Sequence, residues 1–282
     1  MRNELQQLKK CWVKLTLITA LLLVGIAVYA FYPQAPIIPY FYMPDHVWQA
    51  HFETGTFSEY RGGVRVGCGH TEPLSPNPYV HHTISTISIS DNYSEFDYYY
   101  GPPNSVACRA YQIVNLAIPP YDAYNLDDQE ISLTIMVPSH INGDQINVTS
   151  WLSFVTVGTG VLNNGWTIDS GPDRDIHLWL ACKDYVNDSC EAGTVPSATP
   201  YQWTLDEPFT LHAVYLRSTD VLGQRIIIWV NDFSGNHLIV NYTGRTAPAV
   251  PGRYQYYHFG LYMGPGQGTI GWYEDDIEIS IP

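Results

Sequence analysis

The chain has 282 residues and a formal net charge of −14 at pH 7, and 45% of its residues are hydrophobic. This acidic balance argues against nucleic acid as a partner, because the phosphate backbone would be repelled. The length is sufficient for a domain with a sizeable hydrophobic core.

The first 44 residues differ in composition from the rest of the chain. Residues 1–14 are basic, residues 15–32 are uncharged and mostly apolar, and residues 33–44 are rich in proline. An apolar stretch of this length crosses a bilayer as a helix, at about 1.5 Å per residue, with its basic flank on the cytoplasmic side. We therefore predict a cytoplasmic segment, a transmembrane anchor and an extended stalk. The alternative is a signal peptide that is cleaved after Ala30, and both interpretations place residues 45–282 outside the cytoplasm.

The exported part is more acidic than the whole chain. Four of the 13 basic residues and one of the 27 acidic residues precede residue 33, which leaves 9 − 26 = −17 for the remainder. A charge of this size argues against an anionic membrane surface or a highly sulfated glycan as the principal partner.

Four cysteines lie in the exported part, and an even number fits an oxidising compartment. Cys182 and Cys190 bracket a short polar turn, so we predict that a disulfide joins them. Cys68 and Cys108 then remain to pair with each other.

Beyond residue 45, short runs rich in β-branched and aromatic residues recur about every 10 to 20 residues, between turns rich in Pro, Gly, Asn and Asp. These runs are residues 47–52, 83–89, 110–117, 131–137, 151–157, 175–181, 209–217, 225–230 and 237–242. The pattern predicts a β-sandwich that forms one domain, residues 45–282.

The last thirty residues alternate with period two. In residues 254–263, one predicted face carries Tyr257, Phe259, Leu261 and Met263, and the other carries Tyr254, Tyr256, His258 and Tyr262. The same alternation places further polar and aromatic residues on non-core faces, namely His177, Trp179, Arg225, Trp229 and Asn231. Tyrosine and tryptophan rings offer flat apolar surfaces with polar edges, which suit stacking on sugar rings.

Four segments carry a resemblance to a known family: Phe52-Glu-Thr-Gly-Thr-Phe-Ser-Glu-Tyr, Arg225-Ile-Ile-Ile-Trp-Val-Asn, His258-Phe-Gly-Leu-Tyr and Tyr273-Glu-Asp-Asp-Ile-Glu-Ile. In this order they resemble segments of concanavalin A-like jelly rolls related to polysaccharide lyases of the heparin-lyase and glucuronan-lyase kind. The resemblance implies an all-β jelly-roll sandwich in which residues 45–52 lie close to the closing strand at residues 271–281.

The resemblance also implies a lyase site, with two departures. His258 stands where the family has a basic residue before Gly-x-Tyr, and Gly264 stands where it has Gln. In a lyase, His258 or His177 would act as the base, Tyr262 as the acid, and Arg225 or Asn231 as the partner of the uronate carboxylate.

Because the lyase pattern is incomplete, the sequence favours carbohydrate binding by a membrane-anchored jelly roll. The expected ligand-binding residues are Trp179, Arg225, Trp229, Asn231, Tyr254 and Tyr256. Two alternatives stay open: a polysaccharide lyase that cleaves a uronate-containing glycan by β-elimination, and a structural or adhesive surface domain without a sugar ligand.

Asp275 is the acidic residue with the clearest structural expectation. By strict alternation it shares the core-facing side with Tyr273, Ile277 and Ile279, where a carboxylate needs a partner. In the resembling jelly rolls, a calcium ion often joins the first strand's Glu to the closing Asp, which implies a structural calcium at Glu53 and Asp275. The alternative is a carboxylate that accepts backbone N–H bonds at the sandwich edge.

Overall fold

The structure is a computed structural model of the chain. It describes residues 47–60, 64–69, 75–87, 89–90, 92–115, 128–142, 151–158, 165–171, 173–186, 189–216, 218, 223–244 and 256–280. The predicted anchor at residues 15–32, the stalk at residues 33–44 and Tyr254 lie outside these ranges. Within them, no helix has the length and hydropathy of a membrane span.

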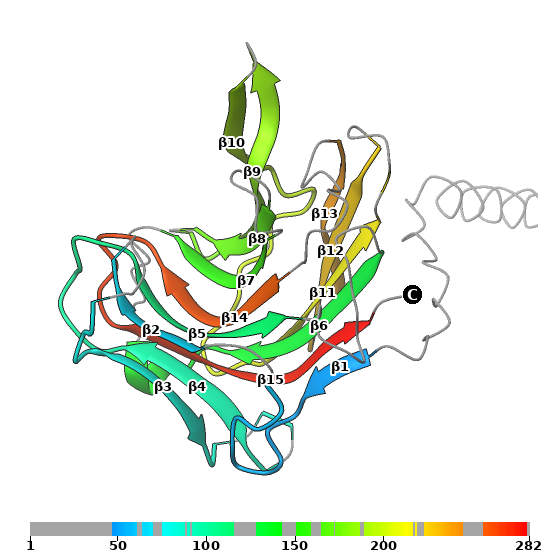
Figure 1. The fold of residues 1–282 in the computed structure, drawn as a ribbon. Coiled ribbons are helices and arrows are strands. Elements are labelled where there is room, and N and C mark those ends of the chain that lie inside the picture. The colour runs from blue at the N-terminus through cyan, green and yellow to red at the C-terminus, as the bar shows by residue number, and fades with distance from the viewer. Residues whose placement is uncertain are drawn as a thin grey trace, which may run out of the picture. The chain divides into compact units, whose positions relative to one another are not determined.

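Two antiparallel sheets form a sandwich (Figure 1). Sheet A contains, in spatial order, β13 (Gly235–Thr243), β12 (Arg225–Asp232), β11 (Phe209–Leu216), β6 (Gln129–Met136), β15 (Ile270–Ser280), β4 (Ser94–Tyr99) and β3 (Val80–Ser85), and β1 (Val47–Ala50) also pairs with β15. Sheet B contains β10 (Ser189–Val195), β9 (Ile176–Val186), β8 (Gly165–Ser170), β7 (Leu152–Gly158), β14 (Tyr256–Met263), β5 (Cys108–Asn115) and β2 (Val64–Cys68). A single helical turn, α2 (Ser139–Asn142), follows β6.

The core lies between the two sheets and follows the period-two alternation of the strands. In β6, Ile131, Leu133 and Ile135 are fully buried, while the residues between them are partly exposed. In β14, the predicted core face is also buried, from Tyr257 to Met263. Burying one face of each strand removes apolar surface from water at about 25 cal/mol per Å², which holds the two sheets together.

The two ends of the domain meet as predicted. β1 pairs with β15 over its whole length, from Val47 opposite Ser280 to Ala50 opposite Ile277. The predicted β-sandwich is therefore confirmed for the described residues.

The predicted disulfide between Cys68 and Cys108 is present, and it ties the edge strand β2 to β5. Cys182 and Cys190 lie in β9 and β10, but their side chains are outside the part of the chain that the structure describes. The backbone register sets Cys190 opposite Tyr185. A disulfide between Cys182 and Cys190 stays a prediction.

The closing strand β15 departs from strict alternation. Trp272 packs edge-on against Phe154 of sheet B, so it faces the core, whereas Tyr273 stacks on Phe96 on the outer side of sheet A. The pairing with β6 then shifts register between Asp275 and Glu278, and Asp276 has a φ of 48°. The expectation that Asp275 shares a core-facing side with Ile277 and Ile279 is wrong, because this bulge reverses the alternation between them.

Candidate functional site

The face of sheet B that points away from sheet A carries the side chains that could bind a ligand or transfer protons. We call it the outer face of sheet B. It carries Arg109 and Tyr111 on β5, His258 and Tyr262 on β14, Ser153 and Thr156 on β7, Thr167 and Asp169 on β8, and His177 and Trp179 on β9. In Figure 1 the hairpin of β9 and β10 rises beyond the rest of this sheet.

Five of these side chains form a row across five neighbouring strands. The register sets Arg109 opposite Tyr262, Tyr262 opposite Ser153, Ser153 opposite Asp169, and Asp169 opposite His177. Directly opposite residues share a face of the sheet, so these five side chains point to the same side, with Ser153 and Asp169 buried within the row.

Arg109 and Tyr262 form the best-defined pair in the row. The Arg109 guanidinium donates to the Tyr262 hydroxyl at 3.2 Å, and its central carbon lies 4.7 Å from the centre of the Tyr262 ring. Trp151 packs edge-on against the same ring, at 4.7 Å and 87°. These contacts fix the phenol in place, and a cation over an aromatic face adds electrostatic attraction.

His258 lies beside this pair as a neutral imidazole. Its ring stacks on Tyr111 with 4.2 Å between the ring centres. Burial, together with the positive charges of Arg109 and Arg65, lowers the pKa of His258 to about 3. Arg65 belongs to this neighbourhood because it stands opposite Tyr111 on β2.

Asp169 is a carboxyl that titrates near neutral pH. It is 5% exposed and accepts a hydrogen bond from the Ser153 hydroxyl at 2.5 Å. Burial raises its pKa to about 7, although the bonds from Ser153 and Thr167 oppose the rise. The next residue in the row, His177, has its pKa lowered by burial, an effect that Asp175 partly offsets.

The structure gathers only some of the predicted site residues. His258, Tyr262, His177 and Trp179 share the outer face of sheet B, and Tyr256 contributes its backbone to β14, whereas its side chain is not described. Arg225, Trp229 and Asn231 belong to β12 in sheet A. The structure therefore does not bring these three to His258 and Tyr262.

The three β12 residues have other neighbours. Arg225 donates to the Asn241 side chain at 3.0 Å, and Trp229 stacks on His212 with 5.6 Å between ring centres. Asn231 lines a shallow pocket on sheet A together with Asp232 and Asp276. This pocket is a second place where sugar hydroxyls would find hydrogen-bonding partners.

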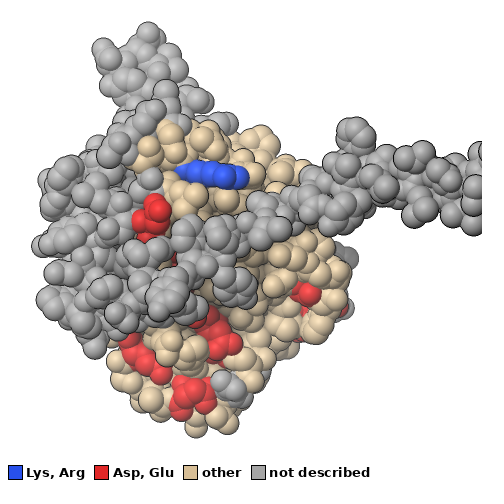
Figure 2. All heavy atoms as spheres, turned by 90° about the vertical axis from the view of Figure 1, so that its right-hand side faces the viewer, with Lys and Arg blue, Asp and Glu red and all other residues tan. Residues whose placement is uncertain are grey.

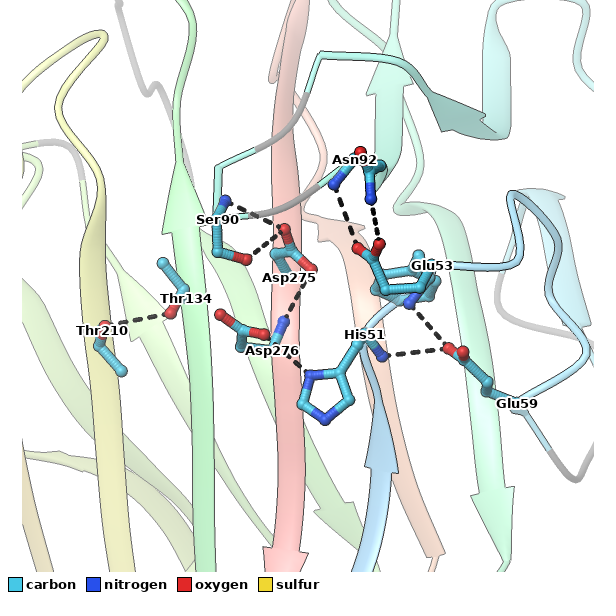
Figure 3. A network of polar contacts seen from close by, with 10 residues as sticks. His51, Glu53, Glu59, Ser90, Asn92, Thr134, Thr210, Asp275 and Asp276 are labelled. Carbon is cyan, nitrogen blue, oxygen red and sulfur yellow. Dashed lines mark hydrogen bonds and ion pairs between the residues drawn. The ribbon is translucent and has the colours of Figure 1, made fainter.

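Glu53 and Asp275 bind the same short segment (Figure 3). The Glu53 carboxylate accepts from the Asn92 backbone N–H at 3.2 Å and from the Asn92 side chain at 2.6 Å. Asp275 accepts from the Ser90 hydroxyl at 2.9 Å and from the Asp276 backbone N–H at 2.9 Å. Burial raises the pKa of Asp275 to about 6. The oxygen donors fit calcium, although each carboxylate already accepts hydrogen bonds from the protein.

Sequence reasoning missed Arg65, Arg109, Tyr111, Trp151 and Asp169. Arg109 had a usable signal, because it lies between Cys108 and Ala110, which are buried, immediately before the predicted strand at residues 110–117. Asp169 had none, since β8 was not predicted and every residue of that strand is buried.

No protein-family model matches the sequence, and no curated protein matches it significantly. In structure, the chain is similar to a marine alginate lyase from Aplysia kurodai, with a TM-score of 0.52 and 8% identity over 78% of this chain and 98% of that one. A glucuronan lyase from the fungus Trichoderma reesei aligns with a TM-score of 0.48 and 11% identity, over 79% of this chain and 96% of that one. The lectin UEA-II aligns with a TM-score of 0.44 and 10% identity, over 72% of this chain and 90% of that one.

The similarity to the Aplysia alginate lyase defines the class of the fold. The chain is a jelly roll that resembles those of the polysaccharide lyases, as the sequence segments predicted. At 8% identity the similarity concerns the fold and leaves the activity to be argued from the site.

Proposed function

We propose that the chain is a polysaccharide lyase that cleaves a uronate-containing glycan on the outer face of sheet B. The observation that carries the proposal is the grouping of Arg109, Tyr262 and a neutral His258. Sequence reasoning favoured binding over catalysis because the lyase pattern is incomplete, and the basic residue it named, Arg225, lies on sheet A. Arg109 and Arg65 supply that missing element.

The arginines have a defined role in such a reaction. Removing the proton at C5 of a uronate builds negative charge next to its carboxylate, so a cation that neutralises the carboxylate makes this proton more acidic. Arg109 presents a planar guanidinium that matches a carboxylate in two parallel hydrogen bonds. Its local charge also offsets the repulsion that a net charge of −17 on the exported part would exert on a polyuronate.

His258 and Tyr262 would move the protons. A base takes the C5 proton, the C–H electron pair forms the C4–C5 double bond, the C4–O4 bond breaks, and an acid protonates the departing O4. His258 is neutral and can accept a proton, and the Tyr262 hydroxyl can donate one. A uronate carboxylate bound by Arg65 and Arg109 would offset the charges that hold the pKa of His258 to about 3, which makes the imidazole a stronger base when substrate is present.

The disulfide and residues 15–32 bear on the compartment in which the protein acts. The Cys68–Cys108 disulfide fits an oxidising compartment. Residues 15–32 would anchor the protein in a membrane, or would be removed as a signal peptide, with the jelly roll outside the cytoplasm in both cases. A structural calcium at Glu53 and Asp275 would stabilise the fold and take no part in the proposed reaction, because neither carboxylate belongs to sheet B.

Carbohydrate binding without turnover is the second candidate. It is supported by the aromatic rings of Trp151, Trp179 and Tyr262, which suit sugar stacking whether or not a bond is cleaved. In this case the glycan would bind and be recovered intact.

The test is to incubate the full chain with glucuronan and with alginate and to analyse the products by absorbance and mass spectrometry. A lyase gives an unsaturated uronate at each new non-reducing end, and its products are lighter by one water than hydrolysis products. Intact polysaccharide together with measurable binding would support the second candidate instead.

A further inference from the structure

A group of charged side chains lies in the core between the sheets, apart from the site on the outer face of sheet B. We call it the buried cluster, and it consists of His82 on β3, Glu95 and Asp97 on β4, and Glu274 on β15. Glu95, Asp97 and Glu274 are 0%, 1% and 0% exposed. Ionised carboxylates are rarely buried to this extent unless they are paired or bind a metal.

Three members of the cluster converge on one point. The His82 Nδ1 atom lies 2.5 Å from Asp97 Oδ1 and 3.1 Å from Glu95 Oε1. One ligand atom from each of these residues lies within 4.8 Å of the other two. The Phe57 ring stacks on the His82 ring, with 4.1 Å between their centres, and the His82 side chain is 5% exposed.

The protein supplies too few donors for these carboxylates. The Tyr60 hydroxyl donates to Glu95 Oε2 at 2.5 Å, and the Trp272 indole donates to Glu274 Oε1 at 2.6 Å. Glu274 also accepts from the Gly260 backbone N–H. Within the described part of the chain, buried Asp97 Oδ2 has no hydrogen-bond partner. Three carboxylates therefore face a single imidazole, and the cluster carries an excess of negative charge unless a cation or protons offset it.

We propose that His82, Glu95 and Asp97 bind a divalent transition-metal ion, such as Zn²⁺, between the two sheets. An imidazole nitrogen with two carboxylates suits zinc and its first-row neighbours, whereas calcium and magnesium prefer sites made of oxygen alone. The ion would replace protons shared between His82 and the carboxylates, at ligand distances of about 2.0–2.2 Å. Gln112 would orient the His82 ring, because its side-chain amide lies 2.6 Å from His82 Nε2.

The ion would also brace the strand that carries the proposed catalytic residues. Gly260 lies between His258 and Tyr262 on β14 and has a φ of +106°, and a Cβ at this position would come 2.2 Å from Asp97 Oδ2. The cluster therefore fits directly against this strand. Its ligands come from β3 and β4 of sheet A, and Gln112 belongs to β5 of sheet B, so the ion would tie the two sheets together under the outer face.

The experiment is to purify the full chain without a polyhistidine tag and to measure its metal content by mass spectrometry after dialysis. We expect about one equivalent of a transition metal in the wild type and less than about a tenth of that in Asp97→Asn and His82→Gln. The matched control is His81→Ala, because His81 neighbours His82 on β3 but stacks on Tyr98 on the outer side of sheet A. This variant should retain the metal.

A second readout is independent of how the variants fold. Wild-type protein stripped with a chelator should gain roughly 5 to 10 °C in melting temperature when Zn²⁺ is supplied at a hundredfold its dissociation constant. The Glu53→Gln variant lacks a predicted calcium ligand, so any effect of Ca²⁺ on it would come from another site. In this variant, Zn²⁺ should raise the melting temperature and Ca²⁺ should not. Metal-free wild type whose melting temperature ignores both Zn²⁺ and Mn²⁺ would show that the cluster shares protons instead, and would overturn the proposal.

Discussion

Asp169 shows how one buried side chain sets a pH dependence. Its pKa is raised to about 7 in the folded protein, from an ordinary value of 3.8. The folded protein keeps this proton up to about pH 7, whereas the unfolded chain releases it near pH 4. The stabilising contribution of the bound proton is therefore fully present at low pH and is lost as the pH rises through 7.

We predict that Asp169→Asn removes this pH dependence. Between about pH 5 and about pH 8, the wild-type free energy of unfolding should fall by about 2 to 3 kcal/mol more than that of the variant, because asparagine carries no titrating proton. Asparagine can still accept the hydrogen bond from Ser153, so the local structure should persist. Urea unfolding at the two pH values measures the difference, and parallel pH profiles for the two proteins would contradict the prediction.

At the residue scale, the alternation of β14 was enough to separate His258 and Tyr262 from the core. The neighbours of these residues across the sheet could not be predicted from the sequence, because the register between distant strands depends on long-range pairing. Arg225 shares its strand side with Trp229 in the sequence, but only the topology shows that β12 belongs to sheet A. The basic partner of Tyr262 is Arg109, which lies 153 residues away along the chain.

Among the elements, the edge strand β2 depends on its disulfide. Cys68 and Cys108 close a segment with a sequence separation of 40, and Arg109 follows Cys108 directly. Replacing both cysteines by serine should lower the free energy of unfolding by about 2 to 4 kcal/mol, mainly by giving the unfolded chain more conformational freedom. Urea unfolding of the double variant checks this loss. A wild-type value that reduction with a thiol leaves unchanged would count against it.

The end of β15 is the second element with a testable dependence. If calcium binds Glu53 and Asp275, adding Ca²⁺ should raise the melting temperature of the wild type by several degrees and chelation should lower it, because the ion binds only the folded state. Asp275→Asn should abolish the response. The control is Asp173→Asn, since Asp173 is exposed. A melting temperature that calcium and chelator leave unchanged would contradict calcium binding at Glu53 and Asp275.

The strands illustrate which elements sequence patterns can reveal. Strands with one apolar face, such as β6 and β11, were predicted because apolar residues alternate along their sequences, and burial alternates with them in the structure. β4 was missed because Glu95 and Asp97 occupy its core-facing positions, which inverts the usual pattern. The bulge in β15 was missed as well, because an extra residue at a register shift leaves no mark on hydrophobic periodicity.

On the scale of the whole molecule, the local charge at the proposed site differs from the overall charge. Acidic side chains predominate among the charged atoms drawn in colour on the face shown in Figure 2, in keeping with the net charge of −14. Against this background, Arg65 and Arg109 form a local basic region on the outer face of sheet B. A polyuronate would be attracted to this basic region and repelled by the acidic surface elsewhere.

The measurement that tests the central claim most directly is the initial rate of unsaturated product formation from glucuronan and alginate by the wild type and three variants. Arg109→Ala should lower kcat/KM by about 100-fold or more, and Tyr262→Phe by a similar factor, because the first removes the carboxylate partner and the second the proton donor. Arg225→Ala should retain the wild-type rate, since Arg225 lies on sheet A. Absence of unsaturated product from every uronate polymer, or equal rates in Arg109→Ala and Arg225→Ala, would contradict a lyase site on the outer face of sheet B.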